Sequence, residues 1–140
     1  MSRVFWDTNI FIYFFEDHGQ QGKSARALRE RMLRRGDQLI TSAMSFGEIL
    51  VKPRERQDLD LCKRYEEAIT STALVLPFDL NAAKRFSMLR VDRSLRAPDA
   101  IQLACAATFG ADLFITNDSR LSDLKVDGIQ FIVSLDRSPL

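Results

Sequence analysis

The chain has 140 residues, of which 46% are hydrophobic and 28% charged, with 20 basic and 19 acidic side chains. This length and composition fit one folded domain that needs no disulfide or structural metal, and they exclude a disordered chain. No apolar stretch reaches the roughly 18 residues of a membrane helix. No signal-peptide pattern precedes the first apolar run, so we expect a cytoplasmic protein without membrane attachment.

Short apolar runs, rich in β-branched and aromatic residues, alternate with helical patterns along the whole chain. The strands predicted from these runs are 4–6, 38–41, 73–76, 112–116 and 129–133. The helices predicted from apolar spacing and end signals are 9–16, 23–35, 41–51, 55–71, 80–95 and 97–107. This alternation predicts an α/β fold in a single domain, residues 1–140, with a central parallel β-sheet flanked by helices on both faces.

Several local predictions rest on a few residues. Residues 17–22 read as a polar loop, and Pro53 is expected to end the helix before it. Helix 9–16 is apolar almost all round, so we expect it to be buried. His18, the only histidine, has no His or Cys neighbour, and a solvated side chain is preferred over a metal ligand or general base.

Cysteine and arginine usage give two further expectations. The two cysteines form no CxxC pair, so we predict reduced thiols in or near the core. The net charge of +1 argues neither for nor against a nucleic-acid partner. Arginines nevertheless gather in two segments, as Arg26, Arg29, Arg31, Arg34 and Arg35, and as Arg85, Arg90, Arg93 and Arg96. A solvated helix surface is the ordinary interpretation, and an RNA-facing or partner-facing surface is the alternative.

Four acidic residues fall where a parallel sheet would bring them together. Asp7 directly follows the first strand, and Asp118 follows the strand that ends at Thr116. Glu48 and Asp99 each lie near the beginning of a predicted helix. Strand carboxyl ends and the following helix starts share one edge of such a sheet, so the four carboxylates can converge in one cleft.

Gathered carboxylates repel one another, and a divalent cation stabilises such a set. Oxygen ligands without histidine or cysteine favour Mg²⁺ or Mn²⁺ over Zn²⁺. Such an ion suits phosphoryl chemistry, because it polarises the phosphate and lowers the pKa of an attacking water.

Each acid also has a structural interpretation. Glu48 lies three residues after Ser45 and could complete a capping box. Asp99 lies in a first helical turn, where the helix dipole favours any acid. Asp118 could cap a helix or stabilise a turn, and Asp7 could cap the helix that follows it. Four acids at one edge still favour a site over four separate structural roles.

The order of these motifs resembles the four signatures of PIN-domain ribonucleases, and most of all the VapC-type toxins of toxin–antitoxin pairs. The segments that carry the resemblance are Asp7-Thr8-Asn9, Ser45-Phe46-Gly47-Glu48-Ile49, Pro98-Asp99-Ala100-Ile101-Gln102-Leu103-Ala104 and Ile115-Thr116-Asn117-Asp118. Any one motif is weak, whereas the ordered four are specific, and the resemblance covers essentially the whole chain.

This resemblance implies a PIN-like fold and a metal-dependent endoribonuclease, the toxin of a type II toxin–antitoxin system, that hydrolyses RNA phosphodiester bonds. It makes Asp7, Glu48, Asp99 and Asp118 both the catalytic and the Mg²⁺- or Mn²⁺-binding residues. Thr8, Asn9, Thr116 and Asn117 would be the polar supports. It also implies a small cognate antitoxin as partner and a homodimer. On the mechanism that this suggests, arginines near the cleft such as Arg93 or Arg96 would hold the RNA backbone.

Three competing interpretations were weighed. A phosphatase of the haloacid-dehalogenase type needs a second acid two residues after the first, where this chain has Asn9. A phosphoacceptor receiver domain needs a paired acid near the first strand and an aspartate at the end of a middle strand, where Pro77 stands. A non-catalytic PIN-like module that binds RNA or protein stays the main alternative.

Overall fold

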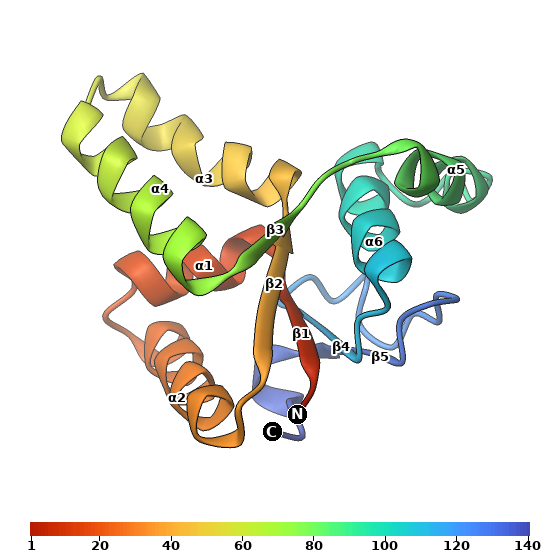
Figure 1. The fold of residues 1–140 in the computed structure, drawn as a ribbon, viewed down its shortest axis with the longest axis horizontal. Coiled ribbons are helices and arrows are strands. Elements are labelled where there is room, and N and C mark those ends of the chain that lie inside the picture. Colours follow the sequence, from red (N-terminus) through yellow and green to blue (C-terminus); the bar gives the residue numbers. More distant parts are fainter.

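The computed structural model describes all residues, 1–140, and contains one five-stranded, fully parallel β-sheet (Figure 1). Its strand order is β3-β2-β1-β4-β5, so the first strand lies in the middle of the sheet. The strands are β1 (Arg3–Trp6), β2 (Gln38–Ser42), β3 (Leu74–Leu76), β4 (Leu113–Thr116) and β5 (Phe131–Ser134). The predicted α/β fold with a central parallel sheet is therefore confirmed.

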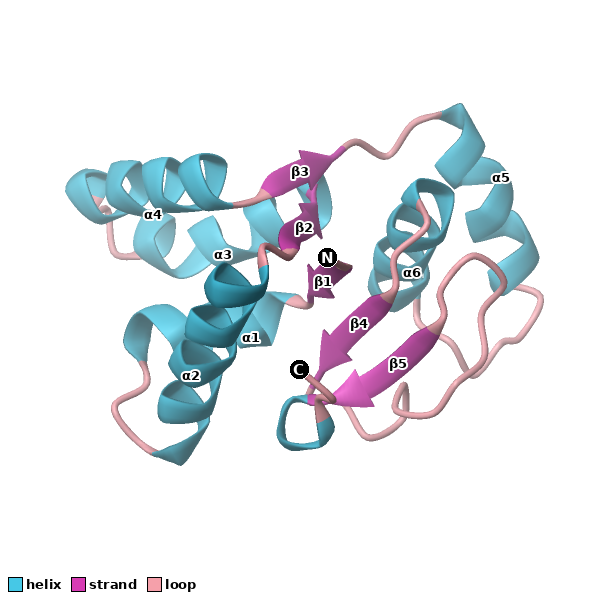
Figure 2. Cartoon of the chain, turned by 60° about the horizontal axis from the view of Figure 1, so that its bottom comes forward, coloured by secondary structure: helices cyan, strands magenta, loops and turns pink.

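Helices cover both faces of the sheet, which also agrees with the prediction. On one face lie α1 (Thr8–Glu16), α2 (Gln20–Arg35), α3 (Ala43–Glu55) and α4 (Leu59–Thr72) (Figures 1 and 2). On the other lie α5 (Leu80–Leu89) and α6 (Ala97–Phe109), and a short 3-10 turn, η1 (Leu135–Arg137), follows β5. No helix is long and apolar enough to cross a membrane.

The sheet separates two hydrophobic clusters because successive strand residues point to opposite faces. Val4 and Trp6 of β1 belong to the cluster beneath α1–α4, whereas Phe5 belongs to the cluster beneath α5 and α6. Phe5 stacks on Phe114 of the neighbouring strand with ring centroids 4.7 Å apart. A strand that is buried on both faces has a continuous run of apolar residues, and this run made the strand Val4–Trp6 predictable from the sequence.

The strand order creates a topological switch point between β1 and β4. From β1 the chain builds outward to β2 and β3 on one side, and later to β4 and β5 on the other. Ligands of open α/β sheets bind at the carboxyl ends of the strands at such a point. Asp7 and Asp118 follow the two strands that flank it.

The predicted loop 17–22 is too long, because α2 begins at Gln20 rather than at Lys23. The Asp17 carboxylate accepts hydrogen bonds from the backbone N–H of Gly19 (2.8 Å) and of Gly22 (3.0 Å), which starts the helix early. Gly22 permits this approach, since a Cβ there would lie 1.8 Å from the Asp17 carbonyl oxygen. The exposed His18 lies in the shortened loop, as expected.

Two helix ends were predicted wrongly. Pro53 lies inside α3, which continues to Glu55, because a proline in the last turn disturbs few helical hydrogen bonds. The helix expected over 80–95 ends at Leu89. The following residues form tight turns, in which Asp92 accepts hydrogen bonds from the backbone and hydroxyl of Ser94 at 3.0 and 2.7 Å.

Helix α1 is less buried than its composition suggested. Only Ile10 and Phe11 are fully buried, while the aromatic side chains that follow are partly buried against the core. Both cysteines are free and buried, in agreement with the prediction.

Candidate active site

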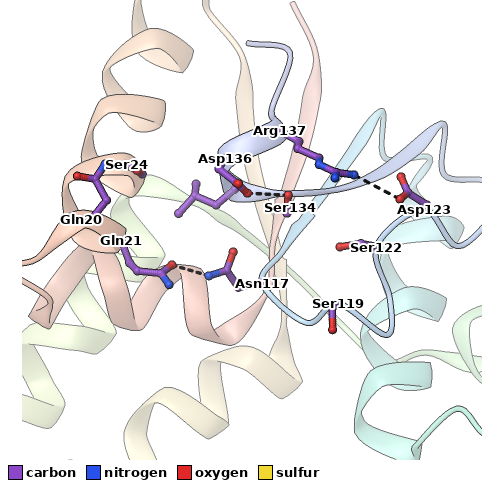
Figure 3. Close-up of a pocket in the computed structure, with 11 residues that line it drawn as sticks. Gln20, Gln21, Ser24, Asn117, Ser119, Ser122, Asp123, Ser134, Asp136 and Arg137 are labelled. Carbon is purple, nitrogen blue, oxygen red and sulfur yellow. Dashed lines mark hydrogen bonds and ion pairs between the residues drawn. The ribbon is translucent and has the colours of Figure 1, made fainter.

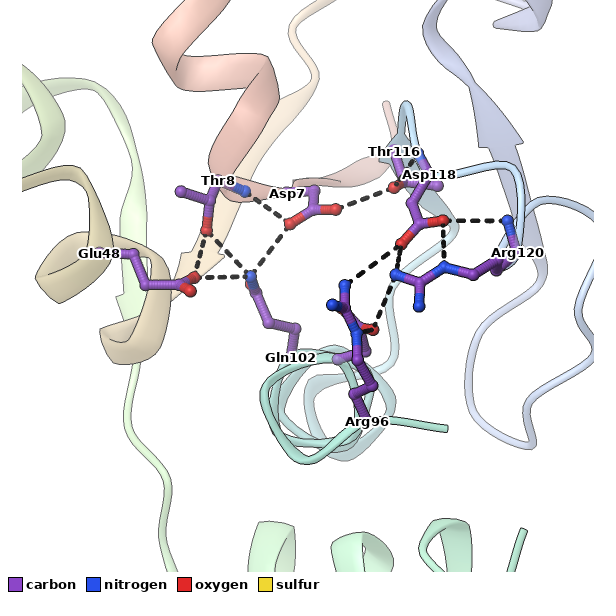
Figure 4. A network of polar contacts seen from close by, with 9 residues as sticks. Asp7, Thr8, Glu48, Arg96, Gln102, Thr116, Asp118 and Arg120 are labelled. Atoms are coloured by element: carbon purple, nitrogen blue, oxygen red, sulfur yellow. Dashed lines mark hydrogen bonds and ion pairs between the residues drawn. The ribbon is translucent and has the colours of Figure 1, made fainter. Parts of the chain in front are cut away.

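The structure brings the four predicted acids to the carboxyl edge of the sheet, where they lie as two pairs (Figure 4). Asp7 caps the start of α1 directly after β1, and Glu48 projects from α3. Asp99 lies in the first turn of α6, and Asp118 follows β4 by two residues. Asp7 and Glu48 share one set of neutral donors, whereas Asp99 and Asp118 share two arginines.

Asp7 is buried and fully engaged. Its Oδ1 atom accepts hydrogen bonds from the Thr8 backbone N–H (2.7 Å) and from the side-chain amide of Gln102 (3.0 Å). Its Oδ2 atom accepts the Thr116 hydroxyl at 2.8 Å. Burial nevertheless raises the pKa of Asp7 above its usual value, and the negative charges of Asp99 and Glu48 act in the same direction.

Gln102 is one of two site residues, with Arg120, that the sequence did not point to. Its buried amide nitrogen donates to Asp7, to Thr8 Oγ1 (3.0 Å) and, at longer range, to Glu48 Oε1 (3.5 Å). Its carbonyl accepts the hydroxyls of Ser42 (3.1 Å) and Ser45 (2.6 Å). The available signal was the only amide in a helix whose other residues, apart from Asp99 and Thr108, are small or apolar.

Glu48 does not complete a capping box with Ser45. The N-cap of α3 is Ser42, whose hydroxyl accepts the backbone N–H of Ser45 at 3.1 Å. The Glu48 carboxylate instead accepts the Thr8 hydroxyl at 2.6 Å, forty residues away in the chain. Its side chain therefore belongs to the site and not to the helix end.

The second pair of acids is held by Arg96 and Arg120. Arg120 binds Asp118 through its backbone N–H (3.0 Å), through Nε (2.9 Å) and through Nη2, and its Nη2 lies 3.7 Å from Asp99. Arg96 lies 3.5 Å from Asp99 and 4.0 Å from Asp118. The hydrogen bond from Arg120 holds the pKa of Asp118 below its usual value. Both arginine side chains are more than half exposed.

Of the four predicted polar supports, only Thr8 and Thr116 contact the acids. Thr8 contacts the first pair, and Thr116 connects the two pairs because its hydroxyl donates to Asp7 and accepts the Asp118 backbone N–H at 3.0 Å. Asn117 donates to Gln21 rather than to an acid. Asn9 is exposed and makes no side-chain hydrogen bond.

The donor set suits a hard divalent cation, but the carboxylates do not form a closed cage. All donors are oxygen atoms, the kind that Mg²⁺ and Mn²⁺ prefer. No group of three or more histidine, cysteine, aspartate or glutamate side chains lies close enough together to hold a metal ion.

Three of the five arginines on α2 bind groups of the same chain. Arg26 donates to the carbonyl of Asp17 (3.0 Å), Arg31 to that of Leu140 (2.7 Å), and Arg35 to the carboxylate of Asp37 (2.8 Å). They therefore fasten α2 to its surroundings, and the cations nearest the acids are Arg96 and Arg120. Arg96 had been considered from the sequence, whereas Arg120 had not.

Residues 4–127 match the PIN domain family. The chain belongs to this family. The match spans all four acids and Gln102, and it confirms the resemblance seen in the sequence motifs. Among curated proteins no sequence matches significantly.

Solved structures with the same fold come from toxin–antitoxin complexes. VapBC2 of Rickettsia felis, bound to a promoter DNA fragment, matches with a TM-score of 0.76 and 13% identity over 94% of this chain and 98% of that one. A toxin–antitoxin complex of Klebsiella pneumoniae gives 0.66 and 24% over 90% and 94%. VapBC-5 of Mycobacterium tuberculosis gives 0.64 and 18% over 96% and 99%. At these identities the similarity establishes the PIN fold.

Proposed function

We propose that this PIN-domain protein is a metal-dependent endoribonuclease, the toxin of a type II toxin–antitoxin pair. The observation that carries the proposal is the edge at the β1/β4 switch point, which gathers four acids, two of them in contact with two exposed arginines. A structural role would not require acids that follow β1 and β4 and acids on α3 and α6 to share one edge of the sheet.

In this proposal Asp7, Glu48, Asp99 and Asp118 hold Mg²⁺ or Mn²⁺. When bound, the ion supplies Lewis-acid polarisation of a phosphodiester and a lowered pKa for an attacking water. Gln102, Thr8 and Thr116 fix the first pair of carboxylates through neutral hydrogen bonds that leave their charge in place. Arg96 and Arg120 can bind the non-bridging oxygens of the phosphate, because guanidinium matches phosphate geometry.

The partners in the proposal are an antitoxin and a second copy of the chain. The complexes that share the fold are described as toxin–antitoxin complexes, which supports a small protein partner. Large apolar side chains are exposed on and around α5, among them Leu80, Met88 and Val91. Exposed apolar side chains of this kind support a protein interface where they are contiguous. Light scattering of the purified chain at several concentrations would test for a homodimer.

The test of function is cleavage of a labelled, unstructured RNA with Mn²⁺ and with EDTA. We expect cleavage with Mn²⁺ only, and its loss in Asp7→Asn, which keeps the size and capping ability of the side chain. The exposed Asp60→Asn on α4 is the matched control and should cleave like the parent. If the parent protein binds RNA but never cleaves it with Mn²⁺, the non-catalytic binding module replaces this proposal.

A further inference from the structure

A polar groove is lined by the two residues that flank Asp118 in the chain, Asn117 and Ser119 (Figure 3). Its volume is about 640 Å³, and ten of its eleven lining residues are polar. The start of α2, the loop after β4 and the η1 turn after β5 form its walls. This volume falls within the range of roughly 300–1,000 Å³ that is typical of ligand pockets.

The groove adjoins the proposed active site through the loop that carries Asp118. Asn117 and Ser119, the two neighbours of Asp118 in the chain, line it. A strand whose phosphate reaches Asp118 and the arginines would therefore place the adjoining nucleotide at this groove. Neither the carboxylates nor the arginines of the site line it.

The lining is suited to neutral polar groups and unsuited to phosphate. Its one cation, Arg137, lies 3.7 Å from the carboxylate of Asp123, and Asp136 adds a second negative charge. Most of the remaining groups are hydroxyls and amides, which both donate and accept hydrogen bonds. The edges of unpaired RNA bases carry the same mixture of donors and acceptors.

We infer that this groove is a nucleobase-binding subsite that reads the base next to the cleaved phosphate. The inference rests on the proposed nuclease function for its biological role, but base binding itself can be measured without cleavage. No aromatic side chain lines the groove, so recognition relies on hydrogen bonds to the base edge and not on stacking.

Gln21 and Asn117 are the specificity-determining pair in this subsite. The Asn117 amide donates to the Gln21 side-chain carbonyl across the groove, joining α2 to the loop after β4. An incoming base can exchange this hydrogen bond for contacts with its own edge, so no polar group is left unpaired. Replacing one amide by an apolar side chain of similar size removes that exchange.

The first experiment maps cleavage sites in a random single-stranded RNA pool by sequencing. We expect a base preference at a nucleotide beside the cleaved bond, which falls about 5- to 10-fold in Gln21→Leu, the equivalent of about one lost hydrogen bond. The matched control is Gln38→Leu, an exposed glutamine at the opposite end of the sheet, which should keep the preference. An unchanged preference in Gln21→Leu overturns the inference.

A binding experiment separates this inference from the failure of the proposed function. Anisotropy with the Asp7→Asn protein compares a short RNA with the same RNA lacking one base. We expect the Asp7→Asn protein to bind the abasic RNA about 5- to 10-fold more weakly than the intact RNA. The double variant Asp7→Asn, Gln21→Leu should bind the two RNAs equally. This result supports the subsite even if no variant cleaves RNA. Equal binding of both RNAs by Asp7→Asn overturns it. A second contradicting result would be nuclear magnetic resonance shifts of the groove residues when a basic peptide is added but not when RNA is added.

Discussion

The two halves of the acidic edge are built from different chemistry. Asp7 and Glu48 are held by buried or half-buried neutral donors, of which Gln102 is the centre. Asp99 and Asp118 are held by the exposed cations of Arg96 and Arg120. Neutral buried donors fix a position at low dielectric, whereas exposed arginines can release one anion and bind another. We therefore interpret the first half as the fixed part of the site and the second as the adjustable part.

The largest expected effect separates the halves by activity. Asp7→Asn should lower RNA cleavage by about 1,000-fold or more, because it removes a charge from the fixed half. Asp118→Asn should lower it by about 10- to 100-fold, and raised Mn²⁺ should recover part of the loss. Rate against Mn²⁺ concentration is the measurement. Equal losses with no recovery would contradict the division into fixed and adjustable halves.

The next effect concerns stability. Gln102→Leu removes one buried hydrogen-bond partner from Asp7 and one from each of the hydroxyls of Ser42 and Ser45. We expect it to lower the free energy of unfolding by about 2–4 kcal/mol in urea titrations. Gln130→Leu, at an exposed position before β5, is the matched control and should change it by less than about 0.5 kcal/mol. A Gln102 variant as stable as this control would show that the fixed half does not depend on the glutamine.

A smaller effect is expected in the adjustable half. Arg120→Ala removes the hydrogen bond that lowers the pKa of Asp118, so that pKa should rise toward the usual value for aspartate. Nuclear magnetic resonance titration of the side-chain carboxyl carbon measures it. Arg120→Lys keeps the charge but not the fork of donors, and it should give a smaller rise. If neither variant moves the pKa, the arginine does not control this carboxylate.

The sequence was sufficient for the fold and for placing the acids at the carboxyl edge of the sheet, but not for their division into two pairs. Apolar runs such as Val4–Trp6 identify buried strands, and strand order in a parallel sheet then places Asp7 and Asp118 at one edge. Helix ends were harder, because Pro53 and the start of α2 depend on local hydrogen bonds that no periodicity reveals.

Contacts between distant elements explain what the sequence could not give. Gln102 joins α6 to β1 and α3, and Arg120 joins Asp118 to Asp99, but nothing in either local motif indicates these partners. The groove lined by Gln21 and Asn117 exists only because α2 meets the loop after β4. Motifs locate single carboxylates, whereas the neutral and cationic groups around them come from the tertiary structure.

The smallest effect is a pH dependence that tests whether the fixed half is held at a cost in stability. Burial raises the pKa of Asp7, so between its unfolded pKa of about 3.9 and its higher folded value the folded state binds more protons. Without metal, stability should therefore fall as pH rises through this window.

Asp7→Asn removes that loss and can still pair with Thr8, Gln102 and Thr116. We expect its melting temperature in EDTA to exceed that of the parent by a few degrees at neutral pH, and the difference to disappear near pH 3. Added Mn²⁺ should raise the melting temperature of the parent but not that of Asp7→Asn, because only the parent keeps the buried Asp7 charge that a cation stabilises. A parent protein that is more stable than Asp7→Asn in EDTA at neutral pH would show that its hydrogen bonds outweigh burial and that the fixed half needs no cation.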